Sequence, residues 1–432
     1  STGKPSRGLT NCMSSSGVTF VMNSNKLKLI YDISVLGMGT RSPTARTGVF
    51  RTIENLFEGF LEHPEISLSL NTNPQHLDAT LEYLQLHGLI PEKNYEKRTH
   101  NQKKRGLLQE IFRTGPKPGI RINDRLRLYS NELVKADIFH SPWLPVPKSY
   151  AESNKTRKFI TIHDLIPVLF PDFFTENNVN QFRRNLSSIN RETWVICNSE
   201  STRNDLLNYH TELDPGKVFV TYWAASSLFH RVSDETMLKR VRQKYGIPES
   251  PYILTLATIE PRKNIMAVLR AFREFIMQEK IRNLNLVLVG TKGWKYQEII
   301  DYIESSEELS SRVVFTGYID DSDLAAVYSG AMAFVYPSFY EGFGLPPLEA
   351  MKCGVPVICS NTSSLPEVVG NAGLLTDPND IEGIAESIGT LFNNADMRKR
   401  LSVNSIERSQ KFSWENCIHQ TIQCYISSAK DT

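Results

Sequence analysis

The segment 337–351 combines acidic side chains, glycines and prolines in an order that suits a charged, hydroxylated ligand. It reads PSFYEGFGLPPLEAM and contains Glu341 and Glu349 with seven residues between them. The glycines let a backbone approach a ligand closely, and the prolines suit the first turn of a helix. The free N–H groups and positive dipole end of such a helix attract an anion. Glu349, about one turn inside that helix, can accept hydrogen bonds from the hydroxyl groups of a sugar or a ribose.

The same spacing also fits a purely structural interpretation. In that interpretation Glu341 caps the helix, and Glu349 is an ordinary residue of the helix surface. Spacing alone favours neither interpretation.

Two adjacent cations, Arg262 and Lys263, follow the apolar run 252–257, which predicts a buried parallel strand. An arginine and a lysine at a strand-to-helix turn suit a diphosphate, because both donate charge-assisted hydrogen bonds to phosphate oxygens. Such a pair neutralises a departing nucleoside diphosphate without a metal ion. The alternative is a solvated pair of surface cations.

Two turns in the N-terminal half carry further candidates. His163 and Asp164 follow the predicted strand 158–162, although a lone histidine is more often structural. Gly48 and Arg51 belong to the run RTGVFR, which also fits a simple helix start. Ligands of open α/β sheets bind outside the carboxyl ends of the strands, so the His163 turn lies at a predicted ligand edge.

Alternating strand and helix patterns place these turns in two α/β units. The first unit has predicted strands at 27–35, 136–140, 158–162, 193–197 and 218–222, with a loop at 36–47 and a helix from Gly48. The second has predicted strands at 252–257, 284–289, 313–316, 333–336 and 356–359. Helices between successive strands imply parallel sheets. We therefore expect an α/β protein with two Rossmann-like domains and a cleft between their carboxyl edges.

The segment 337–351 continues into GVPVI, and together they resemble the donor-binding signature of a large retaining glycosyltransferase family. That family includes glycogen synthase-like, sucrose synthase-like and bacterial mannosyltransferases. The form SxxEGFGLPxLEAMxxGxPVI is specific, and the chain has it almost whole. The runs EPRKN at 260–264, TIHDLIP around His163 and RTGVFR around Gly48 resemble further elements of the family. On this resemblance, which covers about 27–428, the chain is identified as a retaining GT-B glycosyltransferase of family 4 type, most similar to bacterial O-antigen or capsule mannosyltransferases.

The resemblance implies a role for each candidate residue. Four are predicted to be catalytic: Arg262 and Lys263 as diphosphate binders, Glu341 as a ligand of donor hydroxyls, and His163 as a contact of the transferred sugar or the acceptor. The predicted donor-binding residues are Gly48, Asn264, Gly317, Tyr318, Gly342, Phe343, Gly344, Leu345 and Glu349. The predicted acceptor-side residues are Arg51 and Asp164.

The resemblance also gives the two units their expected roles. We expect a flexible leader or tag at 1–25 and an N-terminal acceptor-binding domain at 26–225. A nucleotide-sugar-binding domain is expected at 226–411, opening with a charged linker that contains one helix. The last segment, 412–432, is expected to form a helix that crosses back to the N-terminal domain.

The implied reaction is hexose transfer from a nucleoside diphosphate sugar with retention at the anomeric carbon, without a cofactor or a metal. Its main demand is stabilisation of the departing diphosphate. Because the leaving phosphate is thought to help deprotonate the acceptor, Glu341 is not assigned as a nucleophile. No DxD motif stands at a predicted strand end, and Asp320-Asp321 is expected to cap a helix.

The resemblance also implies a donor and an acceptor. The runs DISVL, HDLIP and SFYEGFGLPPLEAM are most similar to mannosyltransferases, so GDP-mannose is the expected donor. The alternatives are dTDP-rhamnose, UDP-glucose, a galactose donor and UDP-GlcNAc. The expected acceptor is a glycan or a polyprenyl-diphosphate-linked glycan in surface polysaccharide synthesis.

Two other classes of protein are alternatives to this one. A dinucleotide-dependent oxidoreductase needs a G-x-G-x-x-G loop, but after Gly37 and Gly39 the chain continues to Ser42. A catalytically inactive sugar-nucleotide-binding protein would not need the full set of charged candidates that this chain has.

Composition restricts the environment. The 432 residues, 40% hydrophobic and 22% charged, suit a globular chain of two domains, and a net charge of +2 does not indicate a nucleic-acid partner. Six cysteines without CxxC spacing favour a reducing compartment over a zinc or redox site. With no long apolar run and no signal-peptide pattern, we expect a cytoplasmic location. The basic segment 97–127 is either a solvated surface or a contact with anionic head groups at the inner face of the membrane.

Overall fold

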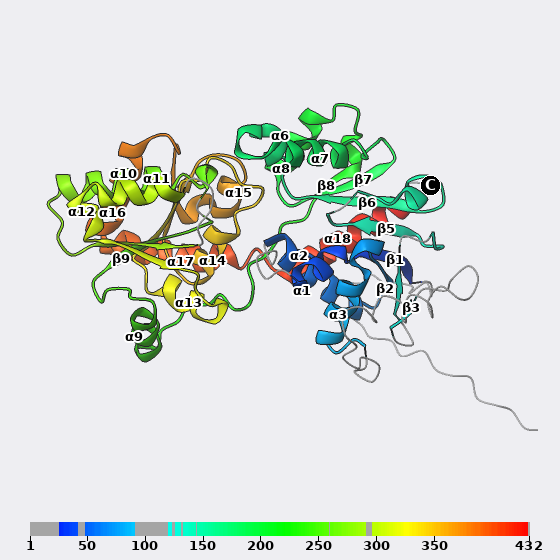
Figure 1. Ribbon diagram of the computed structural model, residues 1–432, viewed down its shortest axis with the longest axis horizontal. Coiled ribbons are helices and arrows are strands. Elements are labelled where there is room, and N and C mark those ends of the chain that lie inside the picture. The colour runs from blue at the N-terminus through cyan, green and yellow to red at the C-terminus, as the bar shows by residue number, and fades with distance from the viewer. Residues whose placement is uncertain are drawn as a thin grey trace, which may run out of the picture.

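The computed structural model describes residues 26–41, 48–90, 120–122, 126–130, 133–143, 145–258, 260–290 and 296–430. These residues form two α/β halves, shown beside each other in Figure 1. Each half is built on a mostly parallel sheet with helices packed against it. The predicted α/β class with two parallel sheets is therefore confirmed.

In the described part of the N-terminal half, eight strands form one sheet in the order β3-β4-β2-β1-β5-β6-β7-β8. Neighbouring strands are parallel, apart from β3 against β4. The strands are β1 Leu27–Asp32, β2 Ile66–Asn71, β3 Ile120–Arg121, β4 Arg127–Tyr129, β5 Ile138–Ser141, β6 Arg157–Ile162, β7 Thr193–Cys197 and β8 Val218–Val220. The helices are α1 Ser34–Arg41, α2 Gly48–Glu62, η2 Pro74–His76, α3 Leu77–Leu86, α5 Lys148–Ala151, α6 Ile166–Leu169, η4 Pro171–Phe173, α7 Glu176–Leu186, α8 Glu200–Tyr209 and η5 Pro215–Lys217.

In the described part of the C-terminal half, six strands form a parallel sheet in the order β11-β10-β9-β12-β13-β14. The strands are β9 Tyr252–Leu256, β10 Asn285–Val289, β11 Val313–Gly317, β12 Ala333–Tyr336, β13 Val357–Ser360 and β14 Gly373–Thr376. The helices are α9 Glu235–Lys244, η6 Pro261–Lys263, α10 Ile265–Gln278, α11 Tyr296–Glu304, α12 Glu307–Ser310, α13 Asp321–Ser329, α14 Leu345–Lys352, α15 Leu365–Val369, η7 Gly370–Ala372, α16 Ile381–Asn393, α17 Ala395–Ser409 and α18 Trp414–Lys430.

The first βα turn differs from the prediction. The strand expected at 27–35 ends at Asp32, and α1 occupies residues that were expected to form a loop. The helix forms here because α1 packs closely on α3: a Cβ at Gly37 would lie 2.5 Å from the Thr80 hydroxyl oxygen. This packing partner is more than 40 positions away, so local sequence did not indicate it.

Three parallel strands of the sheets were not predicted: β2, β4 and β14. In β2 the sequence ISLSLN alternates apolar residues with serines, β4 has only three residues, and none of the four positions of β14 is fully buried. The predicted strands of the second series are apolar runs, of which β12 is buried at all four positions. Where the local apolar pattern is weak, a segment therefore forms a strand because it pairs with a neighbouring strand of the sheet.

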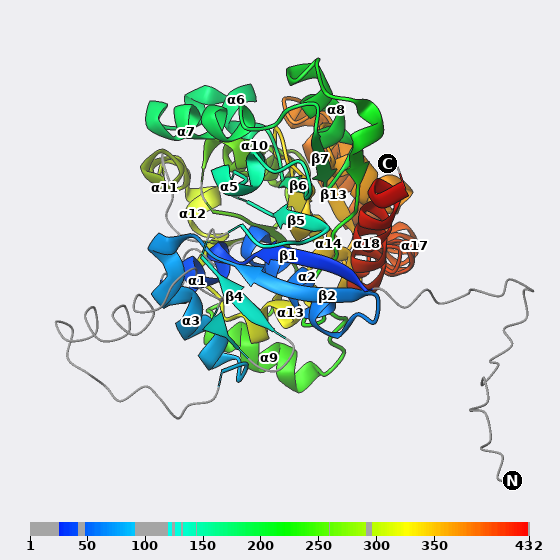
Figure 2. The ribbon, with the colours of Figure 1, turned by 90° about the vertical axis from the view of Figure 1, so that its right-hand side faces the viewer.

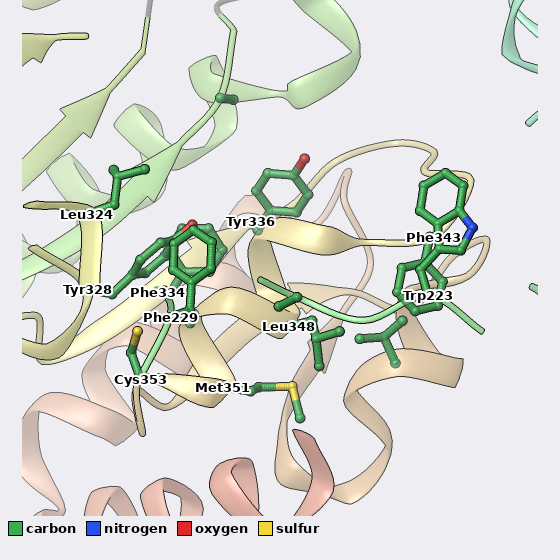
Figure 3. Close-up of a cluster of buried hydrophobic side chains, with 14 of the residues drawn as sticks. Trp223, Phe229, Leu324, Tyr328, Phe334, Tyr336, Phe343, Leu348, Met351 and Cys353 are labelled. Carbon is green, nitrogen blue, oxygen red and sulfur yellow. The ribbon is translucent and has the colours of Figure 1, made fainter. Parts of the chain in front are cut away.

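Buried aromatic side chains continue from the C-terminal core to the junction of the two halves. Figure 3 shows Phe229, Tyr328 and Phe334 gathered on one side of the cluster, and Trp223 beside Phe343 on the other. The ring centroids of Trp223 and Phe343 are 5.8 Å apart. Trp223 follows β8, and Phe343 precedes α14. This contact therefore holds the segment after β8 against the loop 337–344.

The last helix, α18, packs on α2 of the N-terminal half, as Figures 1 and 2 show for the red helix. Tyr425 of α18 is fully buried, and its hydroxyl lies 2.5 Å from His140 Nδ1. Its ring also makes an edge contact with Phe159, with centroids 4.9 Å apart. The final helix is thus anchored to the first sheet by a buried aromatic side chain.

We predict that Tyr425→Ala lowers the free energy of unfolding by about 3–5 kcal/mol, because it leaves a cavity beside the first sheet. Tyr425→Phe keeps the volume and removes only the hydroxyl that His140 contacts, so it should cost about 1–3 kcal/mol. Urea unfolding followed by tryptophan fluorescence measures both. Equal losses for the two variants would contradict the packing contribution.

Candidate active site

Arg262, Lys263 and Glu341 form one ion-paired cluster at the carboxyl edge of the C-terminal sheet. Lys263 Nζ lies 2.7 Å from Glu341 Oε1, and Arg262 Nη1 lies 3.0 Å from Glu341 Oε2. The side chains are only 12%, 12% and 11% exposed, in the order Arg262, Lys263, Glu341. The cations follow β9 and the carboxylate follows β12, and these strands are neighbours in the sheet. The sheet therefore joins two motifs that lie far apart in the sequence.

Hydroxyl groups complete the coordination of the carboxylate. Tyr336 Oη and Ser338 Oγ donate to Glu341 Oε1 at 2.8 and 2.6 Å. Lys263 Nζ also donates to Tyr336 Oη, at 2.7 Å. Glu341 Oε1 therefore accepts from three donors, whereas Oε2 faces Arg262.

The cluster keeps Glu341 ionised. Burial would raise the pKa of Glu341, but the charges of Lys263 and Arg262 outweigh it and lower this pKa to about 2. For Arg262 the directions are reversed. Burial would lower its pKa, but the carboxylates of Glu341 and Glu260 outweigh burial and raise the pKa of Arg262. The structural alternative for Glu341, a helix cap, does not hold, because the carboxylate is bonded to the cations and hydroxyls instead.

The N-terminal half touches this cluster at His163. A Cβ at Gly342 would lie 2.1 Å from the backbone oxygen of His163 and 2.9 Å from Cβ of Asp164. Glycine is therefore required at position 342 for the two sheet edges to meet. Asp164 lies within electrostatic range of Arg262 and Glu341.

The His163 ring is held in one orientation. Its Nε2 lies 2.6 Å from the carbonyl oxygen of Pro142, so the proton is assigned to Nε2. The ring lies between Trp143 and Trp223, with centroid distances of 5.7 and 5.1 Å. Burial lowers the pKa of His163 to about 4, although the Pro142 carbonyl opposes this. Nδ1 is a buried acceptor that bonds to none of the described residues.

Two further contacts across the junction were not predicted. Ser199 Oγ and Thr202 Oγ1 donate to the carbonyl oxygen of Gly342 at 2.7 and 3.1 Å. The Glu367 carboxylate accepts from the backbone N–H groups of Glu200 and Ser201 at the start of α8. The available signal was the polar turn NSES directly after β7, at the carboxyl edge of the first sheet.

A cavity of about 190 Å³ lies between the starts of α2 and α14. Gly48 faces Leu345 there, since a Cβ at Gly48 would lie 2.8 Å from Leu345 Cδ1. Arg51 Nη2 pairs with Asp321 Oδ2 at 2.6 Å across the two halves, and Glu349 lines the same cavity. The structure thus places Arg51, predicted on the acceptor side, opposite Leu345 and Glu349, which are predicted to bind the donor.

Glu349 is a buried carboxyl group in this cavity. Tyr328 Oη donates to Glu349 Oε2 at 3.1 Å. Burial raises the pKa of Glu349 to about 7, the charge of Arg51 opposes this rise, and the charge of Asp321 adds to it. With 8% exposure, Glu349 is not the surface residue that the structural interpretation proposed.

Three of the remaining predicted donor-binding residues have different structural roles: one forms a turn, one packs a buried ring, and one makes hydrogen bonds within the scaffold. Gly344 has φ +113°, precedes α14 and permits the turn into that helix. The Phe343 ring is buried between Trp223 and Phe412, so only its backbone is placed to meet a ligand. Asn264 has φ +56°, and its Nδ2 donates to the carbonyl oxygens of Pro337 and Pro378, which makes its side chain part of the scaffold.

The predicted nucleobase edge lies at the end of β11. Gly317 has φ +72°, and a Cβ there would meet open space, while Tyr318 is 66% exposed. The next turn leads into α13. Asp320, expected to cap α13, stands at the cap position, but its carboxylate pairs with Lys244 at 2.8 Å and makes no cap hydrogen bond.

Comparison with known proteins agrees with this geometry. The family described as "Glycosyl transferases group 1" matches residues 239–408, which contain Arg262, Lys263, Glu341 and Glu349. The chain is also 36% identical over 283 residues to the O-antigen chain mannosyltransferase B of Escherichia coli, covering 65% of this chain and 72% of that protein. The chain belongs to the group 1 glycosyltransferases.

A second relative and a solved structure show how much of the chain is similar to known proteins. This glycosyltransferase is 31% identical over 276 residues to the serotype-specific mannosyltransferase WbdA of Escherichia coli, covering 62% of this chain but only 34% of that protein. The sucrose-phosphate synthase of Thermosynechococcus elongatus has the same fold, with a TM-score of 0.63, 19% identity, and coverage of 94% of this chain and 100% of that chain. The predictions of a GT-B fold and of an enzyme of the hexosyltransferase class are confirmed.

Other predictions are not decided by the glycosyltransferase structure. Most of the basic segment 97–127 and the leader at 1–25 lie outside the described residues. Within the described ranges, no helix is both long and apolar enough to cross a membrane. The domain boundaries, the absence of a metal requirement and the cellular location stay predictions.

We predict that Glu349 makes the stability of the glycosyltransferase fall between pH 4.5 and 7. The pKa of Glu349 is raised from 4.5 to about 7, so the folded state holds this proton more tightly than the unfolded chain. Its contribution to stability is therefore complete below pH 4.5, is lost as the pH rises to about 7, and amounts to about 3 kcal/mol. Glu349→Gln keeps the shape and removes the titration.

Urea unfolding of wild type and Glu349→Gln at a series of pH values measures this contribution. The stability of wild type relative to the variant should decrease up to about pH 7 and then stay constant. A difference that does not change with pH would contradict the raised pKa.

Proposed function

We propose that this enzyme transfers mannose from GDP-mannose to a glycan or lipid-linked glycan acceptor, with retention at the anomeric carbon. The observation that carries the proposal is the buried Arg262–Lys263–Glu341 cluster, which stands against His163 at the meeting point of two sheet edges. The names of the relatives, an O-antigen chain mannosyltransferase and a serotype-specific mannosyltransferase, support the choice of mannose. The matched part of the chain covers 34% of the length of the second relative, so we do not assign the activities of that whole protein to this chain.

Arg262 and Lys263 would bind the diphosphate of the donor. Lys263 uses two of its three ammonium hydrogens for Tyr336 and Glu341, which leaves one for a phosphate oxygen. The start of α14, where Leu345 faces Gly48, would add backbone N–H groups. These groups are fixed before the reaction, so they stabilise the departing charge without reorganisation. This arrangement supports departure of the diphosphate without a cofactor or a metal.

Glu341 is better suited to orient the donor sugar than to attack it. Three hydrogen-bond donors occupy Oε1, and the adjacent cations hold the pKa of Glu341 at about 2. A carboxylate with so much of its charge neutralised is a weak nucleophile. Glu341 Oε2, which pairs with Arg262, can still accept a hydrogen bond from a sugar hydroxyl group, and this is the role proposed for Glu341.

Glu349 and His163 would hold the two ends of the donor. Glu349 lines the cavity between α2 and α14 and can accept from the ribose hydroxyl groups. His163 is neutral with Nδ1 as an acceptor, so it can receive a hydrogen bond from a hydroxyl of the transferred sugar or the acceptor. We further propose that the acceptor is presented at the inner face of the membrane, in the cytoplasm.

We predict that Lys263→Ala lowers kcat/KM for the donor roughly 100- to 1000-fold, because the leaving diphosphate loses a preorganised cation. Glu341→Ala should lower it likewise, because the donor sugar loses its orienting carboxylate. The matched control is Lys244→Ala, which removes an ion-paired lysine of the same half outside the cluster. Initial rates of donor turnover measure all three. Wild-type rates for Lys263→Ala would refute its role.

A panel of nucleotide sugars tests the donor. GDP-mannose should raise the melting temperature and be slowly hydrolysed, whereas dTDP-rhamnose, UDP-glucose and UDP-GlcNAc should do neither. Retention predicts an α-linked mannosyl product from the α-linked donor, which NMR of the product shows. Turnover of a different donor, or a β-linked product, would overturn the corresponding part of the proposal.

A further inference from the structure

Tyr340, the residue directly before Glu341, is held by the N-terminal half from two sides. Its hydroxyl group donates a hydrogen bond to Asp205 Oδ2 of α8, and a carboxylate acceptor makes such a bond strong. Burial and the Asp205 carboxylate raise the pKa of Tyr340, so the hydroxyl keeps its proton and remains the donor. The Tyr340 ring also meets the ring of Phe170, between α6 and η4, with centroids 5.5 Å apart. With 7% exposure, Tyr340 is buried against the opposite half, although its backbone belongs to the loop after β12.

The backbone of Tyr340 is part of the ion-paired cluster. Arg262 Nη1 donates to the carbonyl oxygen of Tyr340 at 2.7 Å, and the same nitrogen lies 3.0 Å from Glu341 Oε2. Tyr340 therefore connects the N-terminal half to Arg262 through its side chain and its carbonyl group. A displacement of Tyr340 would move both an acceptor of Arg262 and the chain that carries Glu341.

Gly342, on the other side of Glu341, is held by the same helix. Ser199 and Thr202 donate to its carbonyl oxygen. Ser199, Thr202 and Asp205 stand three positions apart, so their side chains lie along one face of α8. Figure 1 shows this helix near the junction with the C-terminal half. Both neighbours of Glu341 are thus held by one helix of the opposite half.

The C-terminal half holds the backbone of Glu341 itself. The N–H group of Glu341 donates to Ser363 Oγ at 3.0 Å, and Ser364 Oγ donates to the Glu341 carbonyl oxygen at 2.9 Å. Hydrogen bonds from the two halves therefore alternate over the three successive residues 340–342. The direction of the Glu341 side chain depends on the positions of both halves.

We propose that the hydrogen bond between Asp205 and Tyr340 positions the ion-paired cluster against the donor sugar. The inference rests on the proposed function, in which Arg262 and Glu341 act on the donor. Asp205 and Tyr340 are positioning residues and not catalytic residues, because their effect passes through the backbone of the loop after β12. The rate of a reaction depends steeply on the alignment of the groups that carry it out, so a small displacement of this loop lowers the rate.

The competing explanation is that the Asp205–Tyr340 bond only holds the two halves together. A second bond of the same kind provides the matched control. Tyr222 Oη, after β8, donates to Glu367 Oε2 of α15 at 3.2 Å, outside the run 340–342. Tyr222→Phe removes a hydroxyl–carboxylate bond from the same junction and keeps the ring. It therefore measures the effect of a weaker junction alone.

The test measures steady-state turnover by the full chain, with the nucleotide sugar that the donor panel identifies, GDP-mannose in the proposal. Tyr340→Phe and Asp205→Ala should each lower kcat roughly 10- to 100-fold. The KM for the donor should stay near its wild-type value, because no phosphate contact is removed. The double variant should lose no more than each single variant, since all three lack the same hydrogen bond. Asp205→Asn keeps an oxygen that accepts from Tyr340 Oη, so it should recover most of the rate.

The rates are scaled to the folded fraction from circular dichroism, so that loss of folded protein does not count as loss of turnover. A normal kcat for Tyr222→Phe beside the losses above supports the inference. Equal losses for Tyr340→Phe and Tyr222→Phe, or losses that multiply in the double variant, would overturn it.

Lys263→Ala separates the inference from the proposed function. If Lys263→Ala is impaired while Tyr340→Phe keeps the wild-type kcat, the positioning role is wrong and the proposed function stands. If Lys263→Ala and Glu341→Ala both keep wild-type rates, the proposed function is wrong, and the inference is wrong with it.

Discussion

The site depends on the pairing of one buried carboxylate with two cations. Glu341 is 8% exposed and stays ionised because Lys263 and Arg262 approach its two oxygens from the neighbouring strand end. Removing one partner of a buried pair costs about 3–5 kcal/mol, because the remaining charge is left uncompensated. The cluster therefore fixes the loop after β12 against the turn after β9, and with it the start of α14.

A second constraint is the close approach at Gly342. The backbone of His163 occupies the space that a side chain at position 342 would need, and Ser199 and Thr202 donate to the Gly342 carbonyl oxygen. These contacts bring a neutral histidine of one half beside a charged cluster of the other. A sugar carried between them would meet an acceptor atom on one side and cations on the other, which is the polarity that departure of a diphosphate requires.

The junction is also the place where opposite charges of the two halves meet. Arg51 comes from α2 and Asp321 from α13, and neither half alone supplies both charges. The cavity of about 190 Å³ lies beside the close approach of α2 and α14, where Gly48 faces Leu345. A cavity that both halves line exists only while the two halves face each other.

The sequence by itself determined the class of the fold and the chemical character of the site. Continuous apolar strands such as β7 and β12, the adjacent cations of 260–264 and the spacing of Glu341 and Glu349 were local patterns, so they could be recognised without the structure. Strands with weak local patterns, β2, β4 and β14, could not, because their pairing partners decide them. Only the tertiary structure decided that Glu341 pairs with both cations, that the Asn264 side chain belongs to the scaffold, and that Arg51 faces Asp321. The physical reason is that the carboxyl ends of strands distant in the sequence converge at one edge, and the distances there depend on packing that no local pattern specifies.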